Sequence, residues 1–324
     1  MKQFAIGVDL GGTKIEIAIV DKNGRIQDKR RFPTNSHSGY NMVLDSIAKA
    51  IEEICLQNNK LKPLAVAIGV AGQIEKETGI VKYAPNLEWH DVNLQKDLSE
   101  KLGIPVSVCN DVKAATIGEW LYGAGKDCDN LVCVFVGTGI GGGIVCDGKM
   151  LEGSNNTAGE IGHITIDLHG PVCHCGNSGC FEALAGGWAI GRDLQKAVLK
   201  NKSAGELLLT IAKGNIKNIT AKTLSEGLKR NNELSKKIFS ELSLALIAGA
   251  VSVVNAFGPA RLIFGGGIME GMPQLLPIIE VGVKKYALKS ATSLLEISPA
   301  KLHNDSGVIG AAAFAFQQNK INVT

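Results

Sequence analysis

The first third of the chain alternates short apolar runs with polar turns. Residues 4–8 and 15–20 are runs of apolar and β-branched residues, turn residues such as glycine, asparagine and aspartate occur in residues 9–13 and 21–24, and residues 25–32 follow as a third segment of similar length. Runs of this length, bounded by such turn residues, are typical of β-strands. The pattern therefore predicts three consecutive strands that form an antiparallel meander.

A helical spacing follows the meander. Met42, Ile47, Ile51 and Ile54 recur at the period of an amphipathic helix, which we predict for residues 40–58. Residues 64–70 and 106–109 are nearly continuous apolar runs, as in buried strands, and residues 97–102 end a second helix at Gly103. The predicted order is β-β-β-α-β-α-β.

The same pattern then begins again. Residues 131–136 predict a strand, residues 137–143 a glycine-rich turn, and residues 144–146 the start of another strand. Both halves thus open with strand, glycine turn and strand, which indicates a structural repeat despite weak sequence identity. Further on we predict a helix over residues 233–257, a strand over residues 261–264 and a final helix rich in small residues.

This pattern predicts an α/β protein of two domains, which also fits a chain of 324 residues. We place the change near Asn110. The first domain is a small α/β domain of residues 1–110, joined by the C-terminal helix of residues 306–318. The second is a larger α/β domain of residues 111–305.

Composition and charge exclude several classes of protein. The formal net charge is only +3, which gives no reason to expect a nucleic-acid or acidic membrane surface. We find no run of eighteen apolar residues and no cleavable signal at the start of the chain. The expected location is therefore the cytoplasm, with no membrane or nucleic-acid partner.

Three of the eight cysteines crowd into one short segment. Cys173, Cys175 and Cys180 have the spacing Cys-x-Cys-x4-Cys, and His163 lies upstream. Zinc prefers four tetrahedral thiolate and imidazole ligands, and a closed Cys3His set is typical of a structural metal. We predict such a zinc site, with His169 as the alternative fourth ligand. A disulfide framework fits poorly with a long chain that has no secretory signal.

Three glycine-rich segments could bind phosphate groups through backbone N–H groups, because glycine leaves that approach open. Neither a Walker A loop nor a dinucleotide fingerprint fits, because both require a helix after the loop and strands follow here. A tight turn without ligand is the alternative for any one loop, but three such loops favour a nucleotide held between two halves. The residues are Asp9, Gly11, Gly12, Thr13 and Lys14; Gly137, Thr138, Gly139, Gly141, Gly142 and Gly143; and Gly265, Gly266 and Gly267.

A set of polar residues completes the chemistry. Asp111 follows a buried strand and can accept a proton from a substrate hydroxyl, although helix N-capping is its alternative role. Sugar hydroxyls both donate and accept hydrogen bonds, which suits a mixed polar set. Paired carboxylates also occur in glycoside hydrolases, but a hydrolase would leave the glycine loops unexplained. The set is Asn86, Asn110, Asp111, Glu160, His163 and Glu182.

These motifs together resemble the ROK family (repressor, open reading frame, kinase). The strongest element is His163 followed by Cys173-x-Cys175-Gly-x-x-Gly-Cys180-x-Glu182. The Asp9–Lys14 loop, Asn110-Asp111, the loop of residues 137–143 and Glu160-x-x-His163 follow in the expected order, so that the resemblance covers residues 6–315. It implies an actin-like ATPase fold, with a duplicated ribonuclease H-like core and two domains around a cleft.

The resemblance also implies a sugar kinase that uses ATP and Mg²⁺. Asp111 would be the catalytic base, the first two glycine loops would bind ATP, and Gly265 to Gly267 would lie near the adenosine. Asn86, Asn110, Glu160, His163 and Glu182 would bind the sugar, with His163 also a zinc ligand. Family members are similar in forming homodimers or homotetramers.

The expected reaction is phosphorylation of a hexose at its 6-hydroxyl, with glucose as the first choice. N-acetylmannosamine, N-acetylglucosamine, mannose and fructose are alternatives. A sugar-sensing regulator without catalysis is disfavoured, because the first loop begins at Asp9 and leaves no room for a DNA-binding region. The chain departs from the family pattern at Gln73, where proline is usual, and at Lys113, where asparagine is frequent. We expect Lys113 to alter the electrostatics of Asp111.

Overall fold

The computed structural model describes residues 3–321, which form two compact units. Unit 1 comprises Met1–Asp129, Gly143–Ala158 and Ala300–Thr324, and unit 2 comprises Asn130–Gly142 and Gly159–Pro299. Residues 111–129, 143–158 and 300–305 were expected in the second domain but lie in unit 1. The assignment of functional domains stays a prediction.

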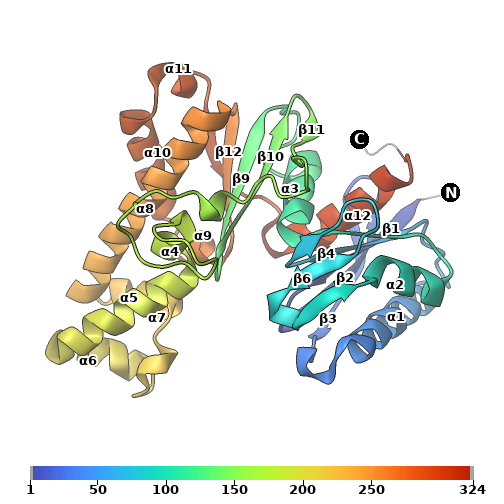
Figure 1. Cartoon of the computed structure of the whole chain (residues 1–324), viewed down its shortest axis with the longest axis horizontal. Coiled ribbons are helices and arrows are strands. Elements are labelled where there is room, and N and C mark those ends of the chain that lie inside the picture. Colours follow the sequence, from blue (N-terminus) through green and yellow to red (C-terminus); the bar gives the residue numbers. More distant parts are fainter. Residues whose placement is uncertain (1–2, 322–324) are drawn as a thin grey trace. The chain divides into compact units, whose positions relative to one another are not determined.

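A five-stranded sheet forms the centre of unit 1 (Figure 1). Its order is β3-β2-β1-β4-β8, with β1, β2 and β3 antiparallel as predicted and β1, β4 and β8 parallel. The parallel strands therefore end at one edge, where Asp9 and Asn110 lie. The strands are β1 (Phe4–Leu10), β2 (Lys14–Asp21), β3 (Ile26–Pro33), β4 (Val66–Val70) and β8 (Val106–Asn110).

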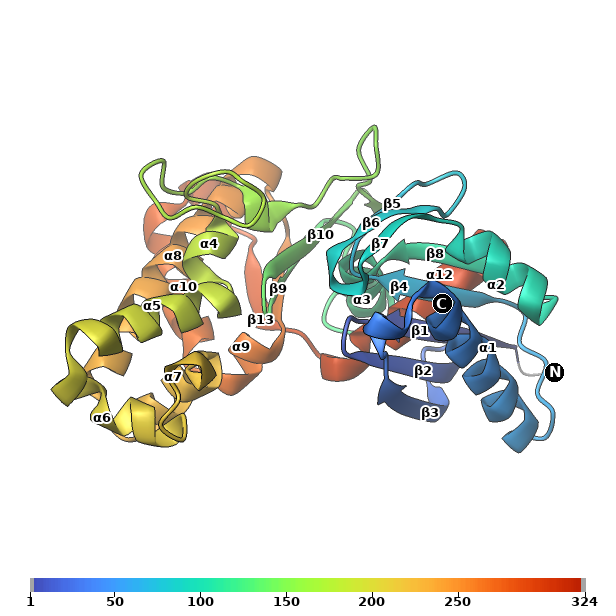
Figure 2. The same cartoon turned by 60° about the horizontal axis from the view of Figure 1, so that its bottom comes forward.

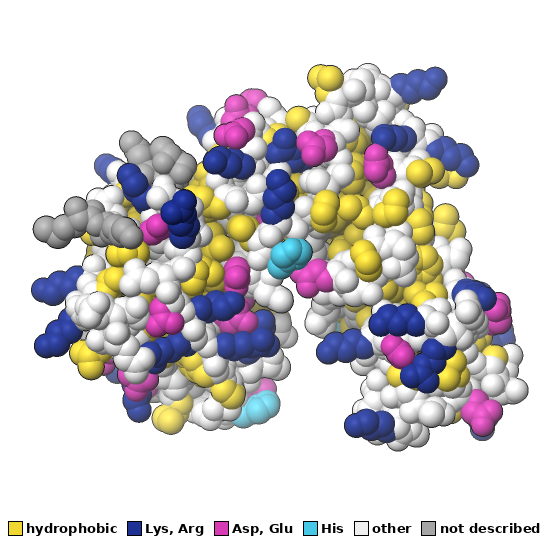
Figure 3. Space-filling model, turned by 180° about the vertical axis from the view of Figure 1, so that it is seen from behind, with side chains coloured by type: hydrophobic (Ala, Val, Ile, Leu, Met, Phe, Trp, Pro, Cys, Tyr) yellow, Lys and Arg dark blue, Asp and Glu magenta, His cyan; other side chains and the backbone are white. Residues whose placement is uncertain are grey.

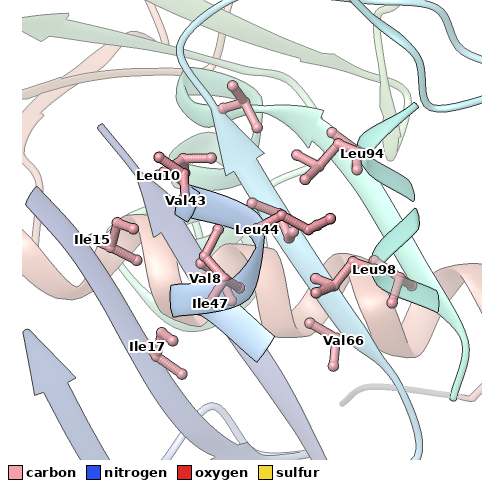
Figure 4. Close-up of a cluster of buried hydrophobic side chains, with 14 of the residues drawn as sticks. Val8, Leu10, Ile15, Ile17, Val43, Leu44, Ile47, Val66, Leu94 and Leu98 are labelled. Atoms are coloured by element: carbon pink, nitrogen blue, oxygen red, sulfur yellow. The ribbon is translucent and has the colours of Figure 1, made fainter. Parts of the chain in front are cut away.

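Helices cover both faces of this sheet. On one face, α1 (Tyr40–Gln57) and α2 (Leu94–Leu102) bury the large aliphatic side chains of the strands, including Val8, Leu10 and Ile17 (Figure 4). The opposite face is lined by small residues such as Ala5 and Ala18, which pack against α12 (Ser306–Gln318). Side chains alternate along a strand, so that the two faces of β1 differ in this way.

Glycines allow α12 to lie very close to its neighbours. A Cβ atom at Gly7 of β1 would stand 1.8 Å from the carbonyl oxygen of Val308, and one at Gly310 would stand 1.6 Å from that of Ala114. Ala114 belongs to α3 (Asp111–Tyr122), which packs beside α12. The small residues of the final helix are thus required by close packing.

A small antiparallel sheet, which the sequence did not predict, also belongs to unit 1. It has the order β5-β6-β7, and β6 pairs with both neighbours. This sheet and the short 3-10 helix within it carry the segment around Asn86. The elements are β5 (Gln73–Ile74), β6 (Val81–Ala84), η2 (Pro85–Leu87) and β7 (Trp89–Val92). The other short 3-10 helices of unit 1 are η1 (Ser36–Ser38) and η5 (His303–Asp305).

The second large sheet repeats the strand order of the first. Its order is β11-β10-β9-β12-β13, with β9, β12 and β13 parallel and β10 antiparallel to β11. The predicted repeat is therefore confirmed by topology. The strands are β9 (Leu131–Val136), β10 (Ile140–Cys146), β11 (Lys149–Met150), β12 (Arg261–Gly265) and β13 (Glu296–Pro299).

The predicted glycine turn of residues 137–143 is too long. Strand β10 begins at Ile140, so that Gly141, Gly142 and Gly143 lie within a strand and only residues 137–139 form the turn. Sheet pairing overrides the turn preference of glycine here, because neighbouring side chains need the space. A Cβ atom at Gly142 would stand 2.3 Å from Ile161, and one at Gly143 would stand 2.1 Å from Thr116.

The helices of unit 2 pack around the long helix α8, whose predicted bounds are confirmed. By length and composition, α8 is the one helix among residues 3–321 that would suit a membrane span. Its contacts with α4, α5, α7 and α10 account for its apolar face instead. The helices are α4 (Phe181–Ala185), α5 (Gly187–Lys200), α6 (Lys202–Ile211), α7 (Ala221–Lys229), α8 (Glu233–Phe257), α9 (Gly267–Gly271), α10 (Leu275–Tyr286) and α11 (Lys289–Thr292), with the 3-10 helices η3 (Ile161–His163) and η4 (Ile216–Asn218) (Figure 2).

Candidate functional site

Unit 2 brings the predicted zinc ligands together. The ligand atoms of His163, Cys173, Cys175 and Cys180 all lie within 4.8 Å of one another. Cys173 Sγ is 3.7 Å from His163 Nδ1, and Cys175 Sγ is 3.6 Å from Cys180 Sγ. Sulfur ligands placed tetrahedrally 2.3 Å from zinc are about 3.8 Å apart. The four residues, which we call the metal knuckle, fit structural zinc, and the group does not include His169.

The backbone of the metal knuckle depends on glycine. The N–H of Cys173 donates to the carbonyl of Asn177 at 2.7 Å, and Gly176 and Gly179 adopt φ of 92° and 70°. A Cβ atom at Gly179 would stand 1.5 Å from the carbonyl oxygen of Asp167. Burial raises the pKa of the Cys180 thiol, whereas the backbone N–H of Asn177 lowers the pKa of Cys175. Metal binding would release such protons, because thiolates are the ligands.

Glu182 connects the metal knuckle to the second glycine loop. It lies in the first turn of α4, two residues after the N-cap residue Cys180. Its Oε2 accepts a hydrogen bond from the N–H of Ile140 at 2.8 Å, and its Oε1 accepts one from the indole Nε1 of Trp188 at 3.2 Å. A Cβ atom at Gly139 would stand 2.2 Å from Oε2, so that the carboxylate requires glycine there. Both oxygens of the predicted sugar ligand thus also have protein partners.

Glu160 and His163 flank the short helix η3. Glu160 is the residue before η3 and is exposed, and His163 ends it. A Cβ atom at Gly162, inside η3, would stand 2.0 Å from the carbonyl oxygen of Ile140. Glycine therefore lets η3 pack directly on the start of β10. The structure places these two predicted sugar ligands beside the same strand that contacts Glu182.

The second and third glycine segments are neighbours in unit 2. The N–H groups of Gly187 and Trp188 donate to the carbonyls of Gly137 and Thr138 at 2.9 and 3.0 Å. Gly266 has φ of 92°, and a Cβ atom there would stand 2.5 Å from the carbonyl oxygen of Val136. Gly265 ends β12 and Gly267 opens α9. The two segments therefore meet at the end of β9.

The first glycine loop lies in unit 1 beside Asn86. The N–H of Gly11 donates to the carbonyl of Lys14 at 3.0 Å, which closes the turn between β1 and β2. A Cβ atom at Gly12 would stand 2.7 Å from the carbonyl oxygen of Asn86. The Lys14 ammonium pairs with the buried Glu16 carboxylate at 2.9 Å. Asn86 and the loop, which are far apart in the sequence, are thus in contact.

Two carboxylates act on each other at the edge of the unit 1 sheet. Burial raises the pKa of Asp9 to about 6, and the negative charge of Asp111 adds to this effect. The Lys14 ammonium opposes the shift. Asp9 belongs to β1 and Asp111 follows β8 directly as the first residue of α3. The sheet therefore brings the predicted base and a second acidic group together.

Asn110 rather than Asp111 caps α3. The Asn110 Oδ1 accepts from the N–H groups of Val112 and Lys113 at 2.9 and 3.1 Å, and its amide donates to the carbonyl of Gly72 at 3.2 Å. The N-capping role that was weighed for Asp111 is thus taken by its neighbour. Asp111 Oδ1 accepts from the N–H of Val112 at 2.9 Å.

The buried Lys113 forms a connection that the sequence did not suggest. Its Nζ donates to the carbonyl of Asn156 at 2.8 Å and to the side chain of the same residue. Asn156 in turn donates to the carbonyl of Ile74 at 2.9 Å. The first turn of α3 is thereby joined to β5 and to the segment around Asn156.

The whole pattern of motifs and topology matches one family. The ROK family model matches residues 5–318. The chain belongs to the ROK family. It is 34% identical over 319 residues to a glucokinase from Halalkalibacterium halodurans. The aligned region covers 98% of this chain and 96% of that relative.

Solved ROK structures agree with this fold. A ROK family glucokinase from Streptomyces griseus, in complex with glucose and AMPPNP, has a TM-score of 0.83, with 31% identity over 97% of this chain and 99% of that chain. A ROK family transcriptional regulator, a homologue of the Escherichia coli MLC protein, has the same TM-score of 0.83, with 26% identity over 97% of this chain and 78% of that chain. The chain thus has the actin-like ATPase fold of ROK kinases.

Two residues of this ROK protein stand out that the sequence interpretation missed. Trp188 donates to Glu182, and Asn156 accepts from Lys113. No local pattern marks Asn156. For Trp188, the available signal was its position six residues after Glu182. The predicted ROK site residues are divided between the units, with Asn86, Asn110 and Asp111 in unit 1 and Glu160, His163 and Glu182 in unit 2.

Proposed function

We propose that the protein transfers the γ-phosphoryl group of ATP to the 6-hydroxyl of a hexose, with glucose as the preferred substrate. The carboxylate pair Asp9 and Asp111 carries the proposal, because a base and a second acidic group lie close enough at the edge of the unit 1 sheet to act on each other. The 34% identity to a glucokinase and the likeness to a glucokinase holding glucose and AMPPNP support it.

Each group has a defined task in this reaction. Asp111, the first residue of α3, accepts the proton of the attacking hydroxyl. Backbone N–H groups of the glycine loops and the Lys14 ammonium stabilise charge on the phosphates. Mg²⁺, when bound with ATP, neutralises phosphate charge, and Asp9 is the residue expected to help hold it.

The sugar ligands in this proposal are Asn86, Asn110, Glu160, His163 and Glu182. They offer amide, imidazole and carboxylate groups, which together can donate to and accept from sugar hydroxyls. The metal knuckle holds His163 and the segment before Glu182 in place. The Nδ1 atom of His163 lies toward Cys173, so that the Nε2 atom of the same ring stays available for a sugar hydroxyl.

Replacement of the proposed base tests the function. In Asp111→Ala we expect turnover to fall by roughly 10²- to 10⁴-fold, the usual contribution of general base catalysis, while glucose binding stays measurable by calorimetry. Asp45→Ala, at an exposed position of α1, is the control and should retain activity. Turnover of Asp111→Ala near the wild-type rate would refute the role of Asp111.

A panel of sugars in a coupled ADP assay tests the substrate. Glucose should give the highest kcat/KM, with N-acetylmannosamine, N-acetylglucosamine, mannose and fructose as competitors. The segment from Gly72 to Asn86, held by the Asn110 amide at Gly72, is where we expect an N-acetyl group to be accepted or refused. A preference for an acetylated sugar would replace glucose in the proposal and leave the reaction class unchanged.

A regulator is the second candidate function, because the chain is also similar to a ROK transcriptional regulator. On the face shown in Figure 3, Lys and Arg side chains are dispersed among Asp and Glu, which offers no basic stripe there for DNA. Stabilisation by glucose in a thermal shift assay without any turnover would favour the regulator.

We further propose that the protein is cytoplasmic and forms a homodimer or homotetramer, in line with the family.

A further inference from the structure

Trp188 packs against the metal knuckle. Its ring lies against the buried cluster of Cys173, Cys180 and Ala183. It also stacks on the ring of His174, with centroids 4.0 Å apart and an interplanar angle of 21°. Cys173 and Cys180 are metal ligands in our proposal, and His174 lies between two of them in the chain. The position of the indole ring therefore depends on the shape of the metal knuckle.

The same residue also holds the glycine loop. The backbone N–H of Trp188 donates to the carbonyl of Thr138 at 3.0 Å. Its indole Nε1 donates to Glu182 Oε1 at 3.2 Å, and Glu182 Oε2 accepts from the N–H of Ile140 at 2.8 Å. An indole has a single donor, so that this bond fixes how the Glu182 carboxylate meets the loop.

These contacts leave little room for adjustment. A Cβ atom at Gly139 would stand 2.2 Å from Glu182 Oε2, and one at Gly187 would stand 2.6 Å from the carbonyl oxygen of Gly137. Packed interiors have few voids and transmit displacement. A movement of the Trp188 ring must therefore move Glu182 or the loop of residues 137–139.

We propose that Trp188 is a positioning residue that couples the metal knuckle to the glycine turn of residues 137–139 and the start of β10. The consequence for ATP rests on the proposed function, in which this loop binds phosphate groups. Metal loss then weakens nucleotide binding through Trp188 and Glu182, in addition to any effect on the sugar ligands. The coupling needs no contact between the metal and the nucleotide.

Amide hydrogen exchange of the loop in the zinc-loaded full chain tests the coupling without substrate. Trp188→Ala should accelerate exchange at the Ile140 amide by roughly tenfold, since one net hydrogen bond is worth about that much. Trp188→Phe keeps an aromatic ring but removes the donor and should give a smaller rise. Trp120→Phe, at a half-buried position of α3 in unit 1, is the matched control and should change nothing. Unchanged exchange in both Trp188 variants would overturn the proposal.

Removal of the zinc tests the other end of the connection. A chelator should accelerate loop exchange in the wild type but add little in Trp188→Ala, because the connection is already broken there. An equal further rise in both proteins overturns the coupling. If the chelator unfolds unit 2, amide exchange also rises throughout α8. In that case the variant His174→Ala replaces the chelator experiment. That variant keeps all four ligands and should accelerate both zinc release and Ile140 exchange, and unchanged rates would overturn the proposal.

Nucleotide binding separates this inference from the proposed function. In Trp188→Phe the affinity for MgADP, measured by calorimetry, should fall several-fold while glucose affinity changes less. Equal MgADP affinity in Trp188→Phe and the wild type would overturn the predicted effect on ATP. A wild-type protein that binds no nucleotide would contradict the proposed function, whereas the exchange results would still decide the role of Trp188.

Discussion

Asp9 is the residue at which stability and function are most clearly in conflict. Its carboxylate is largely removed from water and lies near the negative charge of Asp111, and its pKa is raised to about 6. The positive charge of Lys14 lowers the pKa of Asp9 but only partly offsets this rise. A charge held under such conditions destabilises the folded protein, and perturbed carboxylates of this kind are typical of functional sites. The cost is consistent with the role near Mg²⁺ and phosphate that we propose for Asp9.

The pH dependence of stability should reveal this cost. The folded-state pKa of Asp9, about 6, exceeds its ordinary value of 3.8, so that folding favours the protonated form. The contribution of Asp9 to stability is therefore greatest below about pH 4, falls as the pH rises to 6 and is constant above. We expect Asp9→Asn to be more stable than the wild type at pH 8, by on the order of 2 kcal/mol.

Chemical denaturation between pH 4 and pH 8 measures this difference, with Asp45→Asn on the surface of α1 as the control. The advantage of Asp9→Asn should shrink toward pH 4. A difference between Asp9→Asn and the wild type that does not vary with pH would contradict the raised pKa of Asp9.

At the level of elements, the final helix shows how small residues create a tight contact. α12 lies against β1 and α3, and glycine stands where backbones come closest, at Gly7 and Gly310. The same helix begins beside Asp9, because a Cβ atom at Gly307 would stand 3.1 Å from the Asp9 carboxyl carbon. The packing of α12 therefore helps to shape the surroundings of the candidate site.

Addition of one methyl group tests this packing. Gly7→Ala would place a Cβ atom 1.8 Å from the Val308 carbonyl oxygen, so that α12 must shift. We expect a loss of about 1–3 kcal/mol, the usual range for overpacking, measured by urea denaturation. Gly271→Ala, where the new methyl group would meet no atom within 4 Å beyond its own helix backbone and chain neighbours, is the control and should stay within about 0.5 kcal/mol. Equal stabilities of the two variants would contradict the close contact.

At the level of the whole molecule, each unit has a hydrophobic cluster of its own. The large cluster around β1 and α1 belongs to unit 1, whereas the cysteine cluster beside Trp188 belongs to unit 2. Zinc binding contributes to folding only where its ligands lie, and all four lie in unit 2. Metal loss should therefore affect the units unequally.

Removal of one ligand tests this inequality. Cys175→Ser should release zinc and accelerate amide exchange in α4 and α5 by at least tenfold, since about 1.4 kcal/mol or more of metal binding energy is lost. Amide exchange in β1 and α1 should stay unchanged. Cys146→Ser, at an exposed cysteine outside the metal knuckle, is the control and should keep its zinc. Metal analysis that finds no zinc in the wild type would refute the site.

Much of this architecture could be predicted because its signals are local. The meander, the helix α8 and the repeat follow from hydrophobic period and turn residues within short windows. Errors arose where distant residues decide. Gly141 to Gly143 look like a turn in sequence, yet they lie in β10, which pairs with β9 in the sheet. The sheet β5-β6-β7 was missed because its strands are short and carry polar residues.

The sequence by itself determined the family and predicted the cluster of His163 with three cysteines, because these depend on residue type and spacing along the chain. Only the tertiary structure decided that Glu182 and Trp188 hold the glycine loop, that Asn86 touches Gly12, and that Asp9 and Asp111 share one edge. Each of these contacts joins residues that are distant in the sequence. Such pairs come together only through the packing of whole sheets and helices, and no local periodicity records them.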